Sequence, residues 1–507
     1  MSPELPPAVG LNLLKRALIA GVAIVLMTAS AVSAAVFLEV KKINEIVKEF
    51  GGETIDAGVT EADAGEARTI MILGSDQRLG AEREAPRSDT IILARLDPDK
   101  EAITLLSIPR DLKVTIPTKN GPVVSKINEA YTLGGAKLTV KTVEKLFGDA
   151  GSEFFVNHVL NVSFGGFRRA VDYLGCVYTD IDQQYFNDQS DGVTDYATID
   201  IDPGYQKLCG RDALDYVRYR HTDNDLVRAA RQQDFLRQMK AQPQVKKRLT
   251  IENRKELVKV FARYTERDKT LAQTSEIISL LKLGLYIRNN TITEVHFDPD
   301  KFADDGSYLE VGQGELRRVA RDFLAARATK GERSGVEATD DEREEARTRK
   351  KRKKPAKTSE VSGLEVASKE GEDQAILADP KLAFPFYFPT LRSKGGRYAY
   401  PARTYRVRDQ RGKLHQAYRL TFKKGISNEY YGVQGMTWKD APVLDGKPEL
   451  VDRGGRQLAI YFDGRKVRLV AWRTAKGVYY VHNTLSRTLS KRQMLAIAGS
   501  FRRLGKS

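Results

Sequence analysis

Cysteine is scarce in this chain of 507 residues, which contains only Cys176 and Cys209. No histidine and no further cysteine stands beside them at zinc-ligand spacing, so the sequence argues against a zinc site built on these thiols. Two interpretations of the pair stay open: a disulfide, which requires an oxidising compartment, or two separately buried thiols. The sequence also lacks a convincing short-period repeat, which argues against a solenoid.

Aromatic residues are absent between residues 330 and 379, where charged residues dominate. Such a segment cannot bury enough apolar surface to fold, so we predict a charged, disordered linker over residues 329–380. It contains the basic run RTRKKRKKPAK, residues 347–357. This run either contacts an anionic polymer or lipid, or serves as a solvated tether.

Acidic residues are outnumbered by basic ones over the whole chain, and the formal net charge is +16 with a pI of about 9.5. This balance suits nucleic acid, an anionic membrane surface or a phosphorylated substrate, and it does not choose between them. The length exceeds that of one ordinary core, so we expect two or more domains.

One long run, Ala17 to Leu38, contains no charged residue. As a helix it would extend about 33 Å, enough to cross a bilayer. Lys15 and Arg16 precede it, so we predict a cytoplasmic tail (residues 1–14), a single transmembrane anchor (residues 15–40) and an extracytoplasmic remainder. A cleaved signal peptide is the alternative, although the run is longer than the usual signal core. An extracytoplasmic location favours the disulfide.

Three apolar runs follow a predicted stalk over residues 41–67, and each is bounded by polar residues, as buried strands are. Helical patterns lie between and after them, at residues 137–147, after Phe164 and near Ala320. The mixture predicts an α/β layered domain over residues 68–328. The three runs are TIMILGSD, TIILARLD and AITLLSIPRD.

The composition becomes globular again in residues 381–507, where we predict a small α+β domain. QLAIYF and KVRLVAW flank Asp463-Gly464, a strong hairpin signal. Ser490 followed by Gln493 predicts a capped final helix. Nothing in this part of the sequence indicates catalysis.

Charged residues stand at the ends of the three predicted strands. Asp76 follows the first strand, Asp89 precedes the second and Arg110 follows the third. Residues just beyond strand ends tend to meet in a ligand crevice. Two carboxylates that meet need a cation or a proton between them, and oxygen ligands suit Mg²⁺ holding a phosphate.

A second group of candidates lies in YVRYRHTDNDLVRAARQQ, residues 216–233. If this segment begins extended, Arg218 and Arg220 point to the same side. Arg228, Arg231 and Gln232 would then share one face of a following helix. Arginines bind phosphate oxygens in a bidentate manner, so the group resembles an anion-binding cage.

These motifs together resemble the ordered signature of the LytR-CpsA-Psr family, over about residues 69–239 and more weakly to residue 327. The motifs are GSDQR, RSDT, SIPRD, KINEAY with Gly134-Gly135, VSFGGF, and DALDYVRYR followed by DLVRAARQQ. The resemblance implies a three-layer α-β-α domain with a hydrophobic tunnel for a polyprenyl chain. It also implies a polar mouth that binds the diphosphate with Mg²⁺ (or Mn²⁺).

Position by position, the resemblance implies that Asp76 and Asp89 are the metal-associated acids. It implies that the diphosphate-binding arginines are Arg110, Arg218, Arg220 and Arg228, with Lys126 and Gln232 as further candidates. Asp89, Arg110 and Arg218 are the expected catalytic residues, and Asp89 is the expected proton acceptor. Cys176 departs from the glycine of many relatives, which together with Cys209 supports a local disulfide.

The implied reaction attaches a polyprenyl-diphosphate-linked glycopolymer to peptidoglycan at the C6 hydroxyl of N-acetylmuramic acid and releases polyprenyl phosphate. The expected partners are therefore the lipid-linked polymer, peptidoglycan and the cytoplasmic membrane, with no nucleic acid. Three alternatives stay open: a polyprenyl diphosphate pyrophosphatase with the same residues, a membrane-bound regulator, and a non-catalytic wall-binding protein.

Overall fold

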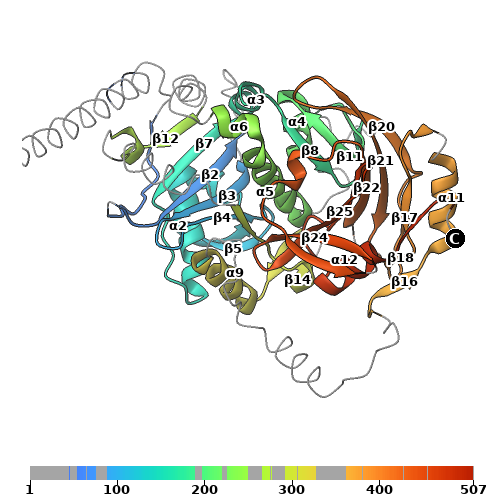
Figure 1. The fold of residues 1–507 in the computed structure, drawn as a ribbon. Helices are drawn as coiled ribbons and strands as arrows, with labels where there is room; N and C mark the ends of the chain where they lie inside the picture. Colours follow the sequence, from blue (N-terminus) through green and yellow to red (C-terminus); the bar gives the residue numbers. More distant parts are fainter. Residues whose placement is uncertain are drawn as a thin grey trace, which may run out of the picture.

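The computed structural model describes most of the chain from residue 54 to residue 505 (Figure 1). The described ranges are 54–63, 65–75, 88–188, 197–219, 225–248, 265–273, 292–304, 307–326, 361–378, 381–425, 428–453 and 455–505, with residues 41, 45 and 276. The predicted tail and anchor lie outside these ranges. No helix in the described part of the chain is long and apolar enough to cross a bilayer.

A mixed seven-stranded sheet forms the centre of the N-terminal domain, in the order β1-β12-β7-β2-β3-β4-β13. The three predicted strands are confirmed as its neighbouring antiparallel strands β2, β3 and β4. The strand bounds are β1 Thr54–Ile55, β2 Arg68–Ser75, β3 Ser88–Asp97, β4 Ala102–Ile108, β7 His158–Ser163, β12 Thr265–Asp268 and β13 Ile292–Val295. Because β1 pairs with β12, the predicted stalk is wrong at residues 54–55, which are part of the sheet.

Helices cover both faces of this sheet. Leu106 and Ile108 of β4 point into a core shared with helices α2 (Glu129–Asp149) and α9 (Gln313–Ala325). The intervening Ser107 points to the other face and reaches helix α5 (Asp225–Ala241). Alternation along β4 thus places the helices in two layers around the sheet, as the α/β prediction requires.

Smaller elements extend the N-terminal domain beside the central sheet. Helix α3 (Phe164–Tyr173) leads into the antiparallel pair of β8 (Val177–Ile181) and β11 (Gly204–Leu208), and helix α4 (Gly210–Arg218) follows. The remaining elements are β5 Lys113–Thr118, β6 Gly121–Lys126, β9 Tyr185–Asn187, β10 Ile199–Ile201, α6 Pro243–Arg248, β14 Phe302–Asp304 and β15 Leu309–Val311.

The C-terminal domain is built on an eight-stranded antiparallel sheet whose apolar face packs against two helices, α11 (Ser368–Ala378) and α12 (Lys491–Gly499). The predicted hairpin at Asp463-Gly464 and the predicted cap of α12 by Ser490 are both confirmed. Its strands are β19 Arg397–Tyr398, β20 Arg403–Arg408, β21 Leu414–Lys423, β22 Tyr430–Met436, β23 Glu449–Arg453, β24 Arg456–Asp463, β25 Lys466–Arg473 and β26 Val478–His482.

The predicted linker is wrong at its C-terminal end. Residues 364–366 form strand β16, which pairs with β18 (Leu391–Ser393), and α11 follows directly. Ala375 and Ala378 of α11 belong to the apolar core of the C-terminal domain, so small apolar residues anchor this otherwise charged helix. Strands β17 (Tyr387–Pro389) and β27 (Phe501–Arg503) pair beside it. The C-terminal domain therefore begins before residue 368.

The second face of the C-terminal sheet covers the N-terminal domain. Tyr178 of β8 and Tyr205 of β11 enter an apolar cluster with Trp438 and residues of β20, β21, β22, β24, β25 and β26. The Tyr178 and Trp438 ring centroids lie 5.0 Å apart, and Tyr178 donates a 2.8 Å hydrogen bond to the carbonyl of Arg408. Figure 1 shows α5 between the central sheet and the C-terminal sheet. The two domains therefore share buried surface.

Candidate functional site

The strand ends that carry the predicted site residues meet at one edge of the central sheet. Strands β2 and β7 run parallel and both end here, with Ser75 paired to Ser163. Strand β3 begins at the same edge, where Ser88 pairs with Ser75, and β4 ends beside it at Ile108. Residues that follow β2, β4 and β7, and those that open β3, are therefore brought together.

Three predicted cations surround two carboxylates at this edge. Arg228 on α5 forms a 2.7 Å ion pair with Asp225, and Arg110 Nε lies 3.6 Å from the same carboxylate. Lys126, the last residue of β6, lies 3.1 Å from Asp111, whose amide donates to Asp225 over 3.1 Å. We name Arg110, Asp111, Lys126, Asp225 and Arg228 the cation cluster. The structure thus unites Arg110, Lys126 and Arg228, which are far apart in sequence.

Burial differs across the cation cluster. The side chains of Arg228 and Asp225 are 6% and 9% exposed, whereas that of Lys126 is 34% exposed. Burial raises the pKa of Asp225 above its ordinary value, although Arg228 and Arg110 act in the opposite direction. The cluster therefore has a buried end at α5 and a solvent-facing end at Lys126, with one more cation than carboxylates.

Asp111 and Asp225 were not among the predicted site residues. Both stand inside the quoted motifs, Asp111 at the end of SIPRD and Asp225 at the start of DLVRAARQQ. Asp225 is the first residue of α5, and the positive end of the helix dipole stabilises an acidic side chain in the first turn of a helix. That helix-start signal could have identified Asp225.

Gln232 joins three elements of the site and is itself nearly buried. Its amide nitrogen donates to Thr90 Oγ1 over 3.0 Å and to the carbonyl of Val217 over 3.3 Å. Thr90 follows Asp89 on β3, and Val217 precedes Arg218 on α4. Gln232 therefore fixes α5 relative to the two segments that carry these predicted residues.

Arg218 reaches the same edge from α4, with its guanidinium 4.0 Å from the ring centroid of Phe164. Phe164 directly follows Ser163 at the end of β7. The predicted extended conformation is wrong at this residue, because Arg218 closes the last turn of α4. The alternation argument that paired it with Arg220 therefore does not hold.

Arg231 does not belong to an anion-binding cage. Its side chain is fully buried, and its guanidinium donates to the carbonyl of Tyr219. The rings of Tyr185, Tyr216 and Tyr219 surround it at 4.7 to 5.8 Å. Arg231 therefore packs as a structural cation among aromatic rings, which helical spacing alone could not distinguish from a ligand-binding arginine.

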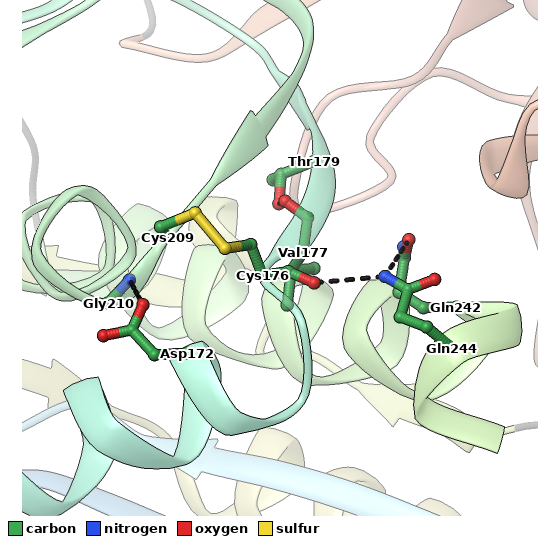
Figure 2. The surroundings of a disulfide bond; sticks show 8 residues. All are labelled: Asp172, Cys176, Val177, Thr179, Cys209, Gly210, Gln242 and Gln244. Carbon is green, nitrogen blue, oxygen red and sulfur yellow. Dashed lines mark hydrogen bonds between the residues drawn. A yellow bond between two sulfur atoms is a disulfide. The ribbon is translucent and has the colours of Figure 1, made fainter. Parts of the chain in front are cut away.

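The predicted disulfide between Cys176 and Cys209 is confirmed (Figure 2). It joins the start of β8 to the residue before α4, next to the pair Val177 and Leu208 of the β8–β11 ladder. The Gly210 amide donates a 2.7 Å hydrogen bond to Asp172 of α3, as Figure 2 also shows. The covalent and polar links together fix the start of the helix that ends in Arg218.

Two local backbone features explain residues around this disulfide. Cys176 has φ of 66°, in the left-handed region that glycine adopts most easily, so a glycine at this position would adopt the same backbone conformation without strain. Gly210 allows α3 and α4 to approach closely, because a Cβ there would lie 2.7 Å from the carbonyl oxygen of Arg168.

Asp76, Arg220 and the side chain of Asp89 lie outside the described residues. Within the described residues, two groups bring three potential ligands together. Cys176 and Cys209 of the first are bonded to each other, and Arg487 already pairs with Glu294 and Asp463 of the second. Neither group fits a metal ion.

Comparison with known proteins supports the family resemblance that the sequence motifs of the N-terminal domain indicate. The LytR_cpsA_psr family model matches residues 33–322. The polyisoprenyl-teichoic acid–peptidoglycan teichoic acid transferase TagU of Oceanobacillus iheyensis is 34% identical over 34% of this chain and 50% of its own length. TagT of Bacillus subtilis, with the corresponding name, is 31% identical over 42% of this chain and 65% of its own. The chain thus spans half to two thirds of these relatives.

Among solved structures, TagT bound to LIIa-WTA covers 54% of this chain and 96% of its own, with 24% identity and a TM-score of 0.40. The family match extends over more than half of the chain and includes every residue of the cation cluster. The chain therefore belongs to the LytR-CpsA-Psr family.

Proposed function

We propose that this protein transfers a polyprenyl-diphosphate-linked glycopolymer to peptidoglycan, at the C6 hydroxyl of N-acetylmuramic acid, and releases polyprenyl phosphate. The observation that carries the proposal is the convergence of Arg110, Lys126 and Arg228 at the strand edge. Three cations in one place suit a diphosphate, and the curated relatives are named as teichoic acid transferases.

In the proposed reaction, the acceptor hydroxyl attacks the phosphorus attached to the glycopolymer. The bond from that phosphorus to the oxygen of polyprenyl phosphate breaks, and the hydroxyl proton passes to a carboxylate. Arg110, Arg228 and Arg218 would neutralise the charge that develops on the phosphates, since arginine stays charged and donates in a fork. We assign the proton acceptor to Asp89, which adjoins Thr90 and thus the Gln232 bridge.

We further propose Asp76 and Asp89 as the residues that hold Mg²⁺ or Mn²⁺. Asp76 directly follows Ser75 in the sequence and Asp89 directly follows Ser88, and these two serines pair across β2 and β3. A divalent ion held by these two acids would supply positive charge to offset the negative charge of the diphosphate.

We place the reaction outside the cytoplasmic membrane, with residues 15–40 as the single anchor and the N-terminus inside. The disulfide between Cys176 and Cys209 supports this location, because disulfides persist in oxidising compartments. A protease-accessibility assay on intact cells tests it, since the C-terminal domain would be cleaved without lysis. Protection of that domain in intact cells would contradict the proposal.

The decisive experiment compares the purified full chain with its Arg228→Lys and Arg228→Ala variants, using a lipid-linked glycopolymer and peptidoglycan as substrates. The alanine variant should lose about 100-fold or more of the transfer rate, and the lysine variant about 10-fold, because lysine retains charge without the fork. Arg411→Ala, on an exposed C-terminal turn, is the matched control and should transfer at the wild-type rate.

The products distinguish transfer from hydrolysis. A transferase yields polymer-bound peptidoglycan and little reaction without acceptor, whereas a pyrophosphatase releases polymer phosphate at the same rate with or without peptidoglycan. Transfer by Arg228→Ala at the wild-type rate would contradict the proposed site.

A further inference from the structure

A pocket of about 330 Å³ lies between the two domains, and no residue of the cation cluster lines it. Gln184, Asp202 and Pro203 line it from the N-terminal domain. Tyr400, Pro401, Arg403, Arg419 and Thr421 line it from the C-terminal domain. The family match ends at residue 322, so most of this wall lies beyond the matched segment. We name it the interdomain pocket.

The inner wall of the interdomain pocket contains polar atoms that the protein leaves unsatisfied. Arg419 is fully buried and uses Nη1 for a 2.8 Å ion pair with Asp180. Its Nε and Nη2 have no hydrogen-bond partner among the described residues, and neither has Oγ1 of Thr421, which is 2% exposed. A buried polar group without a partner costs about 1–3 kcal/mol, so such atoms beside a pocket indicate a ligand or bound water.

The neighbouring strand β22 leaves space for the guanidinium of Arg419. A Cβ on Gly432 of the neighbouring strand β22 would lie 2.0 Å from Arg419 Cζ. Glycine at this position therefore lets the guanidinium lie against the sheet while Asp180 holds its far end. The contact with β22 and the ion pair with Asp180 together fix the positions of Nε and Nη2.

The outer wall of the interdomain pocket is partly exposed to solvent. Tyr400 is half-buried and Pro401 is exposed, so the pocket opens at the rim they form. Arg403 is held there by a 2.9 Å ion pair with Asp202. Each of the two arginines thus has its own carboxylate, and the wall is close to neutral.

We propose that the interdomain pocket binds one sugar ring of a wall glycan. Two neighbouring oxygen acceptors on the ring would satisfy Nε and Nη2 of Arg419, and Thr421 would bond a further hydroxyl. The pocket volume is near the lower end of the 300–1,000 Å³ range of ligand pockets, which suits a single ring. A neutral wall with paired donors and an aromatic rim matches a hydroxyl-rich ligand better than a strongly charged one.

The choice of a wall glycan rests on the proposed function, because both substrates of that reaction carry sugars. The acceptor peptidoglycan and the transferred polymer are two sources of the same ring chemistry. The experiment therefore uses two probes: the disaccharide that a muramidase releases from peptidoglycan, and oligosaccharides released from the bacterium's own wall polymer.

The test measures binding of each probe to the full chain by isothermal titration, for the wild type and for Thr421→Val and Tyr400→Ala. Valine keeps the shape of threonine and removes an unpartnered buried hydroxyl, so the fold should not lose stability. We expect saturable binding of one probe by the wild type and 5- to 10-fold weaker binding by each variant, about the loss of one hydrogen bond or contact.

Thr404→Val is the matched control, because Thr404 lies on β20 beside Arg403 but does not line the pocket, and its binding should equal the wild type. Absence of saturable binding would show that the pocket holds water only, and equal binding by Thr421→Val would place the sugar elsewhere; either result overturns the proposal. Arg228→Ala should keep sugar binding while transfer falls. Loss of sugar binding alone would therefore leave the proposed function standing, and unimpaired transfer by Arg228→Ala would contradict only that function.

Discussion

Asp268, at the end of β12, is a buried carboxylate that organises the backbone around it. It accepts hydrogen bonds from the amides of Val159, Thr270 and Leu271, at 2.9, 2.9 and 3.0 Å. Burial by itself would raise the pKa of Asp268, but hydrogen bonds from His158 and these neighbours outweigh burial, so its pKa is below the ordinary value. The ionised form is therefore the one that the fold stabilises.

Asp268→Asn should lower the free energy of unfolding at pH 7 by about 1–3 kcal/mol, because the amide has one accepting oxygen in place of two. A lowered pKa stabilises the fold above the unfolded value near 4 and ceases to do so as pH falls through the folded value. The difference between wild type and variant should therefore shrink below about pH 4. Denaturant titrations at several pH values measure it, and a difference that is constant down to pH 2 would contradict the assignment.

Asp149→Asn is the matched control for that experiment. Asp149 is 53% exposed and pairs with Lys145 over 2.9 Å, one helical turn away. Surface pairs of this kind contribute about 0.5 kcal/mol or less, so this variant should be close to wild type.

Arg487 has an unusual backbone for its residue type, with φ of 56°. The left-handed conformation costs a non-glycine residue about 1–2 kcal/mol. Its buried side chain offsets this cost, because Nη1 donates to the carbonyls of Thr484 and Leu485, both at 3.0 Å. In this conformation the other terminal nitrogen of the guanidinium, Nη2, reaches Asp234 of α5 at 2.7 Å.

Helix α5 carries residues of the candidate site and also contacts the C-terminal domain. Its residue Asp234 lies 2.7 Å from Arg487 of the C-terminal domain, and Arg487 also approaches Glu294 and Asp463 at 3.3 and 3.4 Å. Burial would raise the pKa of Asp234, but Arg237 and Arg487 hold it well below its ordinary range. One side of α5 thus binds the C-terminal domain while its first turns carry Arg228 and Gln232.

Arg487→Met should lower the free energy of unfolding by about 3–5 kcal/mol, because three buried carboxylates would lose a shared counter-ion. Adding Glu294→Gln removes one stranded charge and should recover part of that loss. Chemical denaturation of the full chain measures both, with Arg406→Met on an exposed strand position as the control. Equal stability of the single and double variants would show that Glu294 and Arg487 are not coupled.

The elements of this fold differ in how far the sequence predicted them. Apolar runs bounded by polar residues were enough for β2, β3 and β4, and local turn and cap signals were enough for the Asp463 hairpin and α12. The predicted extended conformation is wrong at Arg218, because the pattern of apolar residues in a short segment does not distinguish a buried helical turn from a strand. The linker boundary failed because α11 is anchored by alanines, which charge and aromatic content do not reveal.

Part of the candidate site could be predicted from the sequence and part could not, for physical reasons. Strand ends meet predictably, so Arg110 and its partners could be expected near one edge. The role of Arg231 could not be predicted, because only the tertiary fold brings the three tyrosine rings around its guanidinium. Asp111 and Asp225 were missed because single acids near arginines are common on protein surfaces and acquire meaning only from burial.

The whole molecule should behave as one folding unit although it has two large sheets in two domains. A chain that ends at residue 326 would expose Tyr178 and Tyr205 to solvent and leave Asp180 and Asp234 without Arg419 and Arg487. We expect this truncation to aggregate or to lose its cooperative thermal transition. Calorimetry with the full chain as reference measures this, and a truncated protein with an unchanged transition would contradict shared stability.

The ion pair between Asp234 and Arg487 joins positions 253 residues apart. Asp234 also pairs with Arg237 on α5, and Arg487 also approaches Glu294 and Asp463, so losing one member would unbalance the charge of a buried network and should accompany a change at another of its positions. Close homologues should therefore show positions of this network changing together.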